Sequence, residues 1–208
     1  MHSKENLNDL EMSKKRDHKI MITDEAIAKV PYIRYQEIPK KEYPILQGLA
    51  KEILTISKEQ NNSNEVALTY SLESENLIAN GQHYIGISLG NEHSVDPLAH
   101  PTAYHLVNST SDCVVVSLHN HPSLSKISLA DVQFFLFYAS VKMMVVVTNL
   151  GSISYIVKTS KYNRDKAIKI AKEALTIEHK VENIKGYQEA AKYFLKNCHK
   201  AGIIYEDR

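Results

Sequence analysis

Apolar positions along the chain change their spacing several times, and each change marks a different predicted element. From Tyr43 the apolar residues recur at intervals of three and four, which predicts a helix ending at the polar cluster of residues 59–64. Residues 65–73 and 83–90 are predicted as neighbouring strands, joined across a turn region at residues 76–82. The first third of the chain therefore predicts a helix followed by a strand pair.

The remainder of the chain continues this mixed pattern. Residues 112–120 are rich in β-branched side chains and predict a mostly buried strand. Further elements are predicted as a helix opening at Ser128, strands at residues 143–149 and 152–158, and amphipathic helices at residues 164–177 and 187–198. This order predicts an α/β fold in which helices sandwich a mixed β-sheet.

Three regions follow from the same pattern. Residues 1–40 are rich in charge, which predicts a disordered or loosely docked N-terminal arm. Residues 41–160 carry the alternating elements and form the expected domain, and residues 161–208 form a helical C-terminal extension.

Composition excludes several classes of protein. The chain has 208 residues, of which 43% are hydrophobic, but no window approaches the length of a membrane span. Its N-terminus is polar and lacks the apolar core of a signal peptide, so we expect a cytoplasmic protein without a membrane partner. Cys113 and Cys198 are far apart and have no CxxC spacing, which argues against a disulfide framework or a thiolate zinc site.

Charge is unevenly distributed. The net charge of +1 does not by itself indicate a polyanionic partner. Residues 158–200, however, hold eleven Lys or Arg against five Asp or Glu. Solvated faces of two helices explain this excess, and a nucleic acid or an acidic protein as partner is the open alternative.

The candidate chemistry lies at the end of the strand at residues 112–120. Side chains two residues apart project from the same face of a strand, so His119 and His121 are expected to share one small volume. Asp131, in the first turn of the next helix, is placed to fold back over the strand end. Two histidines and a carboxylate leave a fourth tetrahedral position open, which is typical of a catalytic Zn²⁺ site.

A simpler interpretation exists for the end of this motif. Ser128 and Asp131 have the S-x-x-D spacing of a capping box, in which Ser128 caps the helix and Asp131 lies near its positive end. The preceding histidines favour the metal site over a cap alone. His93 and Asp96 are an alternative ligand set, although surface positions explain them more simply.

The segment HNHPSLSKISLAD at residues 119–131 resembles the HxHP and SxxD signature of the JAMM/MPN zinc metalloprotease superfamily, closest to its bacterial RadC-like branch. The resemblance spans about residues 43–158 and implies the JAB/MPN, cytidine-deaminase-like fold. It also implies His119, His121 and Asp131 as zinc ligands, with Ser128 supporting the oxyanion. The loop between His121 and Ser128 has six residues, one fewer than is usual in the family.

The resemblance further implies a glutamate on an upstream strand. Glu65 is the candidate general base, because a metal-bound water needs a carboxylate in reach that does not bind the metal. Glu73 and Glu75 are weaker rivals, and a solvated strand-edge charge is the simpler interpretation of Glu65. The glycine-rich continuation often found after this glutamate is replaced by VALTYS.

Together these features predict a zinc-dependent hydrolase of peptide or isopeptide bonds, with an extended peptide or a ubiquitin-like protein tail as substrate. The alternative is a RadC-like or phage-associated accessory protein with a structural or vestigial metal site. Such a protein would bind a protein or nucleic acid through its basic C-terminal helices.

Overall fold

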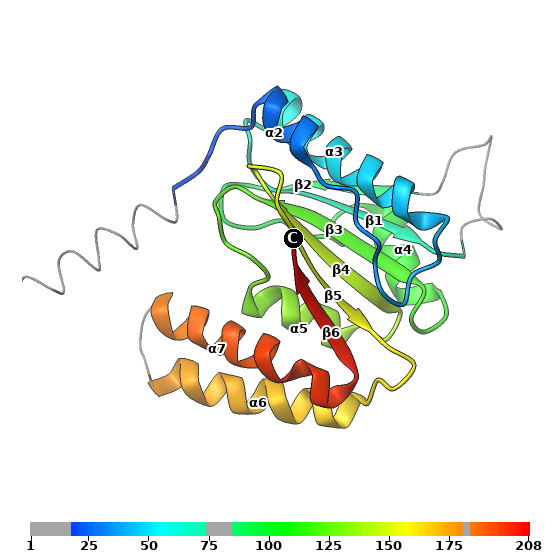
Figure 1. Ribbon diagram of the computed structural model, residues 1–208, viewed down its shortest axis with the longest axis vertical. Coiled ribbons are helices and arrows are strands. Elements are labelled where there is room, and N and C mark those ends of the chain that lie inside the picture. The colour runs from blue at the N-terminus through cyan, green and yellow to red at the C-terminus, as the bar shows by residue number, and fades with distance from the viewer. Residues whose placement is uncertain (1–17, 74–84, 181–183) are drawn as a thin grey trace, which may run out of the picture.

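The computed structural model describes residues 18–73, 85–180 and 184–208 (Figure 1). The helices are α2 (Asp24–Lys29), α3 (Glu42–Gln60), α4 (Pro101–Ser109), α5 (Leu129–Phe137), α6 (Arg164–Lys180), α7 (Ile184–Asn197) and a short 3-10 helix (Cys198–Ala201). The strands are β1 (Val66–Ser71), β2 (Ile85–Leu89), β3 (Val115–His121), β4 (Val141–Thr148), β5 (Ile153–Lys158) and β6 (Ile203–Asp207).

All six strands belong to a single mixed sheet, in the order β2-β1-β3-β4-β5-β6. Strands β3 and β4 are parallel and are connected through α5, whereas the other neighbours are antiparallel. Strand β3 is buried along its whole length and lies between β1 and β4, with His119 opposite Ala67 on one side and Val146 on the other. The carboxyl end of β3 therefore lies in the interior of the sheet.

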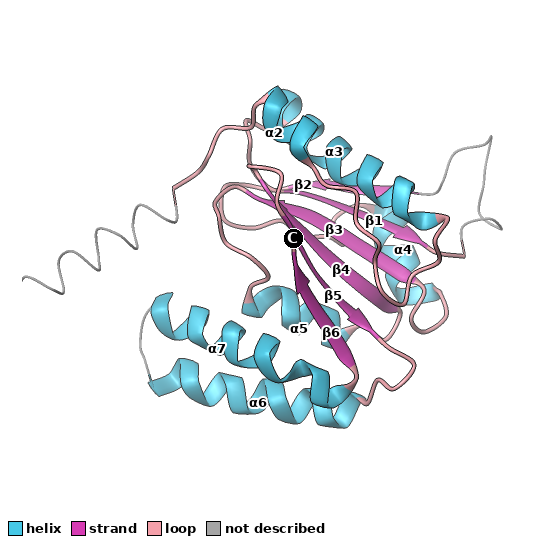
Figure 2. Ribbon diagram, viewed as in Figure 1, coloured by secondary structure: helices cyan, strands magenta, loops and turns pink. Residues whose placement is uncertain are grey.

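Helices cover both faces of the sheet, which confirms the predicted α/β sandwich (Figure 2). Helix α3 packs on one face, against alternate residues such as Val116 and Leu118 of β3. Helices α4, α5, α6 and α7 pack on the other face. The histidines of β3 belong to this second face, because they alternate with Val116 and Leu118 along the strand.

The N-terminal region differs from the predicted arm. Within the described residues 18–40, six apolar side chains are buried, and all but Ala26 belong to the core that α3 covers: Ile22, Ala26, Val30, Ile33, Tyr35 and Ile38. Thr23 caps α2 by accepting a hydrogen bond from the Ala26 amide at 3.2 Å. The expectation of a loosely docked arm is therefore wrong for residues 18–40, and residues 1–17 lie outside the described residues.

The C-terminal region is helical as predicted, but it also contributes a strand. Helices α6 and α7 pack on the sheet through buried residues that include Ala167 and Phe194. Strand β6 was not predicted, and it pairs antiparallel with β5 from Ile203 to Asp207. Residues 161–208 are thus an integral layer of the fold and not an appended extension.

Helix α4 was also not predicted, because its histidines and proline suggested a loop. His100 caps this helix by accepting from the Thr102 amide at 3.2 Å, and Pro101 occupies its first turn, where a missing amide hydrogen costs nothing. The predicted turn region at residues 76–82 lies outside the described residues, as does His83.

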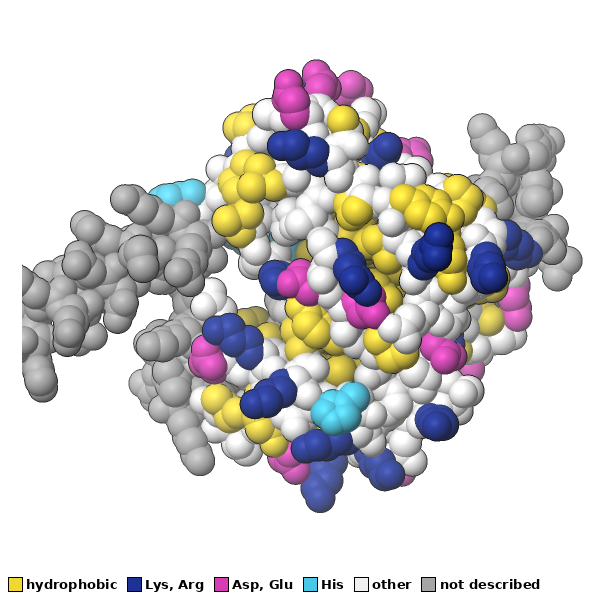
Figure 3. Space-filling view, in the orientation of Figure 1, with side chains coloured by type: hydrophobic (Ala, Val, Ile, Leu, Met, Phe, Trp, Pro, Cys, Tyr) yellow, Lys and Arg dark blue, Asp and Glu magenta, His cyan; other side chains and the backbone are white. Residues whose placement is uncertain are grey.

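The surface agrees with the uneven charge of the sequence. Lys and Arg side chains are spread over α6 and α7 in Figure 3, with a few acidic side chains between them. Lys192 pairs with Glu189 at 2.8 Å on this surface. Among the described residues, no helix combines the length and the apolar character that crossing a membrane requires.

Candidate metal centre

Two histidines occupy the carboxyl end of β3. His119 and His121 project from the same face and are 3% and 6% exposed. The residue between them, Asn120, points to the opposite face, as the alternation of a strand requires. Pro122 follows directly, and residues 122–127 lead into α5.

Asp131 reaches the histidines from the first turn of α5. Ser128 is the N-cap: its hydroxyl accepts from the Asp131 amide at 3.2 Å and donates to Asp131 Oδ2 at 2.7 Å. The Ser128 amide also donates to Oδ2 at 2.7 Å. The capping box is therefore present, and it holds the Asp131 carboxylate facing the histidines. The cap and the metal-site interpretation do not exclude each other, since Oδ1 is directed at His119.

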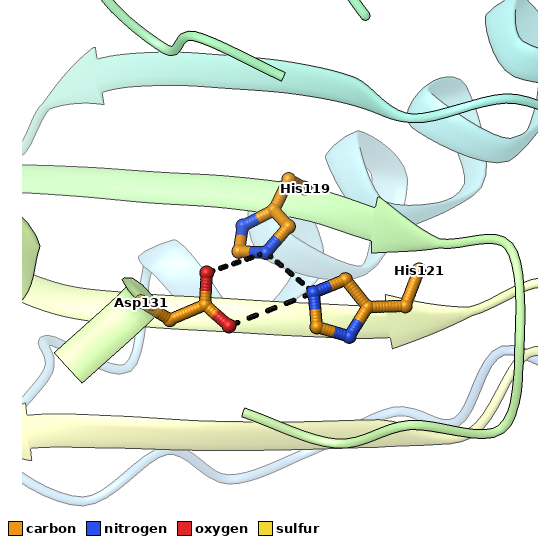
Figure 4. A group of neighbouring side chains, drawn as sticks. All are labelled: His119, His121 and Asp131. Carbon is orange, nitrogen blue, oxygen red and sulfur yellow. Dashed lines mark hydrogen bonds and ion pairs between the residues drawn. The ribbon is translucent and has the colours of Figure 1, made fainter. Parts of the chain in front are cut away.

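The three side chains converge on one point (Figure 4). His119 Nε2 is 3.1 Å from Asp131 Oδ1, and His121 Nε2 is 3.5 Å from Asp131 Oδ2. The two Nε2 atoms are 3.0 Å apart. One ligand atom from each residue lies within 4.8 Å of the others, so the group could hold a metal ion.

The hydrogen bonds of the imidazole rings leave ring nitrogens with lone pairs that could bind a cation at this point. His121 Nδ1 donates to the Ser125 carbonyl oxygen at 2.9 Å, since that oxygen only accepts, and Nε2 of the neutral ring is left with its lone pair facing His119. Two ring nitrogens at 3.0 Å can share at most one hydrogen. His119 Nδ1 is buried and has no partner among the described residues. Two imidazole nitrogens and a carboxylate oxygen are a donor set that suits zinc.

The electrostatics of the three residues are strongly coupled. Burial alone would raise the pKa of Asp131, but the histidines and the Ser128 hydroxyl outweigh it and hold that pKa well below its usual range. Burial lowers the pKa of His121. Burial also acts to lower the pKa of His119, yet the attraction of Asp131 raises it overall. The carboxylate is therefore ionised at neutral pH, as a ligand must be.

A cavity of about 550 Å³ opens beside this group. Glu65 and Ser128 both line it, together with the histidines and Asp131. Glu65 precedes β1 and is 8% exposed, and burial raises its pKa to about 7. The attraction of His119 and a backbone hydrogen bond from Val95 act to lower this pKa, but burial outweighs them. The structure thus brings together all five residues singled out in the sequence.

The rival residues are placed differently. Glu73 follows the far end of β1 and is exposed, and Glu75 lies outside the described residues. His93 and Asp96 line the cavity, but among the described residues they belong to no group that could hold a metal ion. The solvated strand-edge interpretation of Glu65 does not agree with its burial.

Several residues around the site were not predicted from sequence. Lys19 lines the cavity, although its region was expected to be a loose arm. The loop at residues 92–97 forms another wall, and of its residues only His93 and Asp96 were considered from sequence, as an alternative ligand set. The position of Asn120 between the two histidines was visible in the sequence. Its hydrogen-bond partners, Asn64 and Val66, are distant in sequence and could not be inferred.

No family model, curated protein or solved structure matches this chain. The resemblance to the JAMM/MPN superfamily therefore stays a prediction from the motif.

Proposed function

We propose that this protein is a zinc-dependent hydrolase of peptide or isopeptide bonds. The observation that carries the proposal is the convergence of His119, His121 and Asp131 on one point at the wall of a cavity that also contains Glu65. Three protein ligands beside an open cavity match the arrangement of catalytic zinc sites, which keep one position for water or substrate.

His119 Nε2, His121 Nε2 and one oxygen of Asp131 are the proposed ligand atoms. A zinc ion held there would polarise a carbonyl group and lower the pKa of a bound water toward about 7. The Ser125 carbonyl oxygen orients His121, and the Ser128 amide and hydroxyl orient Asp131. Such outer hydrogen bonds fix the ligand geometry before metal arrives.

Glu65 is the proposed general base and acid. Its carboxyl group has a pKa of about 7, so it is able both to accept and to return a proton near neutral pH. In the proposed reaction Glu65 accepts a proton from the attacking water and delivers it to the departing amine. Its burial limits exchange of that proton with bulk solvent.

Ser128 is proposed to support the oxyanion of the tetrahedral intermediate. Its hydroxyl donates to Asp131 Oδ2, and the Ser128 amide donates to the same oxygen. Because the amide remains bound, the hydroxyl is free to turn toward the substrate while Asp131 keeps a partner. A donor at this position stabilises charge that develops only during the reaction.

The cavity suits an extended peptide or the tail of a ubiquitin-like protein better than a large folded surface. It is bordered by polar side chains that include Glu92, Asp96 and Ser123, and by apolar side chains that include Val95, Phe134 and Met144. Pockets of this size bind a short segment and select it through a few polar groups.

The proposal is tested by hydrolysis. Zinc-loaded wild type and His121→Ala are offered quenched fluorescent peptides and ubiquitin-like proteins joined through isopeptide bonds. We expect cleavage by wild type and loss of both zinc and cleavage in His121→Ala, because two remaining ligands bind zinc poorly. Equal cleavage by both proteins would contradict a metal-dependent reaction.

A further inference from the structure

Asn120 lies between the two proposed ligands but faces away from them. Its side chain is on the face of the sheet that α3 covers, where it is fully buried. It therefore cannot touch a metal ion at His119 and His121 or a substrate in the cavity. Any contribution to the site has to pass through its hydrogen bonds.

Two of those hydrogen bonds hold the residues on either side of Glu65. Asn120 Nδ2 donates to the carbonyl oxygen of Asn64 at 3.1 Å, and Asn120 Oδ1 accepts from the amide of Val66 at 2.7 Å. One side-chain amide thus holds the backbone on both sides of the proposed base. The backbone pairing of β1 with β3 begins at Ala67 opposite His119. The Asn120 side chain therefore connects the two segments beyond the end of that pairing.

The backbone of Glu65 itself is held from the other side. Its amide donates to the Asn91 carbonyl oxygen at 3.0 Å, and its carbonyl oxygen accepts from the Gly90 amide at 2.8 Å. Asn61 Nδ2 donates to the same oxygen at 2.8 Å. The chain is therefore fixed on both sides where it enters the cavity wall, and Asn120 is the contact that leads to the histidines.

The orientation of the Asn120 amide is set by its surroundings. Asn149 Oδ1 lies 2.8 Å from Asn120 Nδ2, and Asn149 Nδ2 donates to carbonyl oxygens of Ile20 and Ser63 at 2.7 and 2.9 Å. The Asn149 amide also donates to the His121 carbonyl oxygen at 3.0 Å. Rotating the Asn120 amide by half a turn would direct its NH₂ group at the Val66 amide, which is also a donor.

We propose that Asn120 is a positioning residue that fixes the Glu65 carboxylate relative to His119 and His121. The inference rests on the proposed function, because it concerns the distance between the metal and its base. Asn120 is the neighbour of both His119 and His121 in the chain, so its hydrogen bonds connect the residues that flank Glu65 with the strand segment that carries the two ligands. Positions in a catalytic group need to be held closely, and supporting hydrogen bonds supply that constraint.

The test uses zinc alone as the probe, with NMR of the full chain labelled with ¹³C and ¹⁵N. In wild type, zinc is expected to shift the ring signals of both histidines and the side-chain carboxyl signal of Glu65. Asn120→Ala is expected to bind zinc within about threefold of the wild-type affinity and to keep the histidine shifts, because every ligand remains. The zinc-induced shift of Glu65 should fall by more than about half, since the residues on either side of it, Asn64 and Val66, lose their hydrogen bonds to the strand that carries the ligands.

Ser140→Ala is the matched control. Ser140 is buried at the start of β4, at the opposite end of the sheet from the histidines, and its hydroxyl donates to the Val107 carbonyl oxygen at 2.6 Å. This variant also loses a buried hydrogen bond, but all zinc-induced shifts should remain. Asn120→Ser serves if Asn120→Ala does not fold, because a serine side chain is too short to bridge Asn64 and Val66.

The outcomes separate the inference from the proposed function. A full Glu65 shift in the Asn120 variant would overturn the positioning role. Loss of the histidine shifts together with the Glu65 shift would overturn it as well. Absence of a Glu65 shift in wild type would overturn it too. Zinc binding with a Glu65 shift but no hydrolysis in wild type would overturn the proposed function alone, and failure to bind zinc would overturn both.

Discussion

At the scale of single residues, the site depends on the contrast between one carboxylate that stays ionised and one that takes up a proton near neutrality. Asp131 faces two histidines and accepts two hydrogen bonds from Ser128, which lowers its pKa. Burial raises the pKa of Glu65 to about 7. This separation supports the proposed roles of Asp131 as a ligand and of Glu65 as the acid and base.

Substitution of Glu65 separates these roles. Glu65→Gln keeps the shape of the side chain but removes its ability to accept a proton, so we expect zinc binding to persist and turnover to fall by about 100-fold or more. Glu73→Gln is the control, because Glu73 is exposed beyond the far end of β1. Loss of zinc from Glu65→Gln, measured by elemental mass spectrometry, would instead place Glu65 among the ligands.

Lys158 provides a test of burial that does not involve the site. Its side chain is fully buried, its Nζ donates to the carbonyl oxygens of Tyr138 and Ala139 at 3.0 and 3.3 Å, and burial lowers its pKa to about 8. Below about pH 8 the folded protein carries the full cost of this buried charge. As pH rises toward about 10.4, the ordinary pKa of lysine, the folded state has lost the proton while the unfolded state still holds it, so the cost disappears.

We therefore compare Lys158→Met with wild type by urea denaturation between about pH 7 and 10. The stability of wild type relative to the variant should increase by about 2 to 3 kcal/mol over this range. The changes in shape and packing caused by the substitution affect stability equally at each pH, so the dependence of the difference on pH reports the titration of Lys158. A pH-independent difference would show that Lys158 titrates normally.

At the scale of elements, the strand and helix that carry the site could be predicted, because their signals are local. Alternation places His119 and His121 on one face, and the S-x-x-D spacing places Asp131 in the first turn of α5. Helix α2 and strand β6 were missed because both are short, and neither DEAIAK nor IIYED is long enough to show a repeated apolar spacing. Their stability comes from packing on the sheet, which a local pattern does not contain.

The close approach of α2 to the turn between β4 and β5 gives an element-scale prediction. Gly151 has φ +87°, and a Cβ atom there would lie 2.4 Å from the Ala26 carbonyl oxygen. Gly151→Ala should therefore lower the free energy of unfolding by about 1 to 3 kcal/mol. Gly48→Ala, within α3 with no atom near the new Cβ, should raise it by about 0.5 to 1 kcal/mol. Equal effects in urea denaturation would contradict the described packing of α2.

At the scale of the whole molecule, the sheet brings distant segments to one wall of the cavity. Glu65 precedes β1, the histidines end β3, and Asp131 lies in the first turn of α5. The N-terminal segment reaches the same rim through Ile20, whose amide donates to the Pro122 carbonyl oxygen at 2.8 Å. Of the five site residues, the four within residues 119–131 could be placed together from their motif. Glu65 was added only because the resemblance implied an upstream glutamate. The role proposed for Asn120 could not be predicted, because its side chain contacts Val66 of β1, Ser57 of α3 at 3.2 Å and Asn149 in the turn after β4, which are all distant in sequence.

The central claim is that His119, His121 and Asp131 hold zinc, and the most direct measurement is the metal content of the purified protein by elemental mass spectrometry, before and after zinc is offered at neutral pH. We predict about one zinc ion per chain in wild type and almost none in His119→Ala/His121→Ala. Zinc should also raise the melting temperature of wild type only, because it binds the folded state. Wild type that takes up no metal, or a double variant that retains it, would contradict the claim and leave Ser128 and Asp131 as a helix cap.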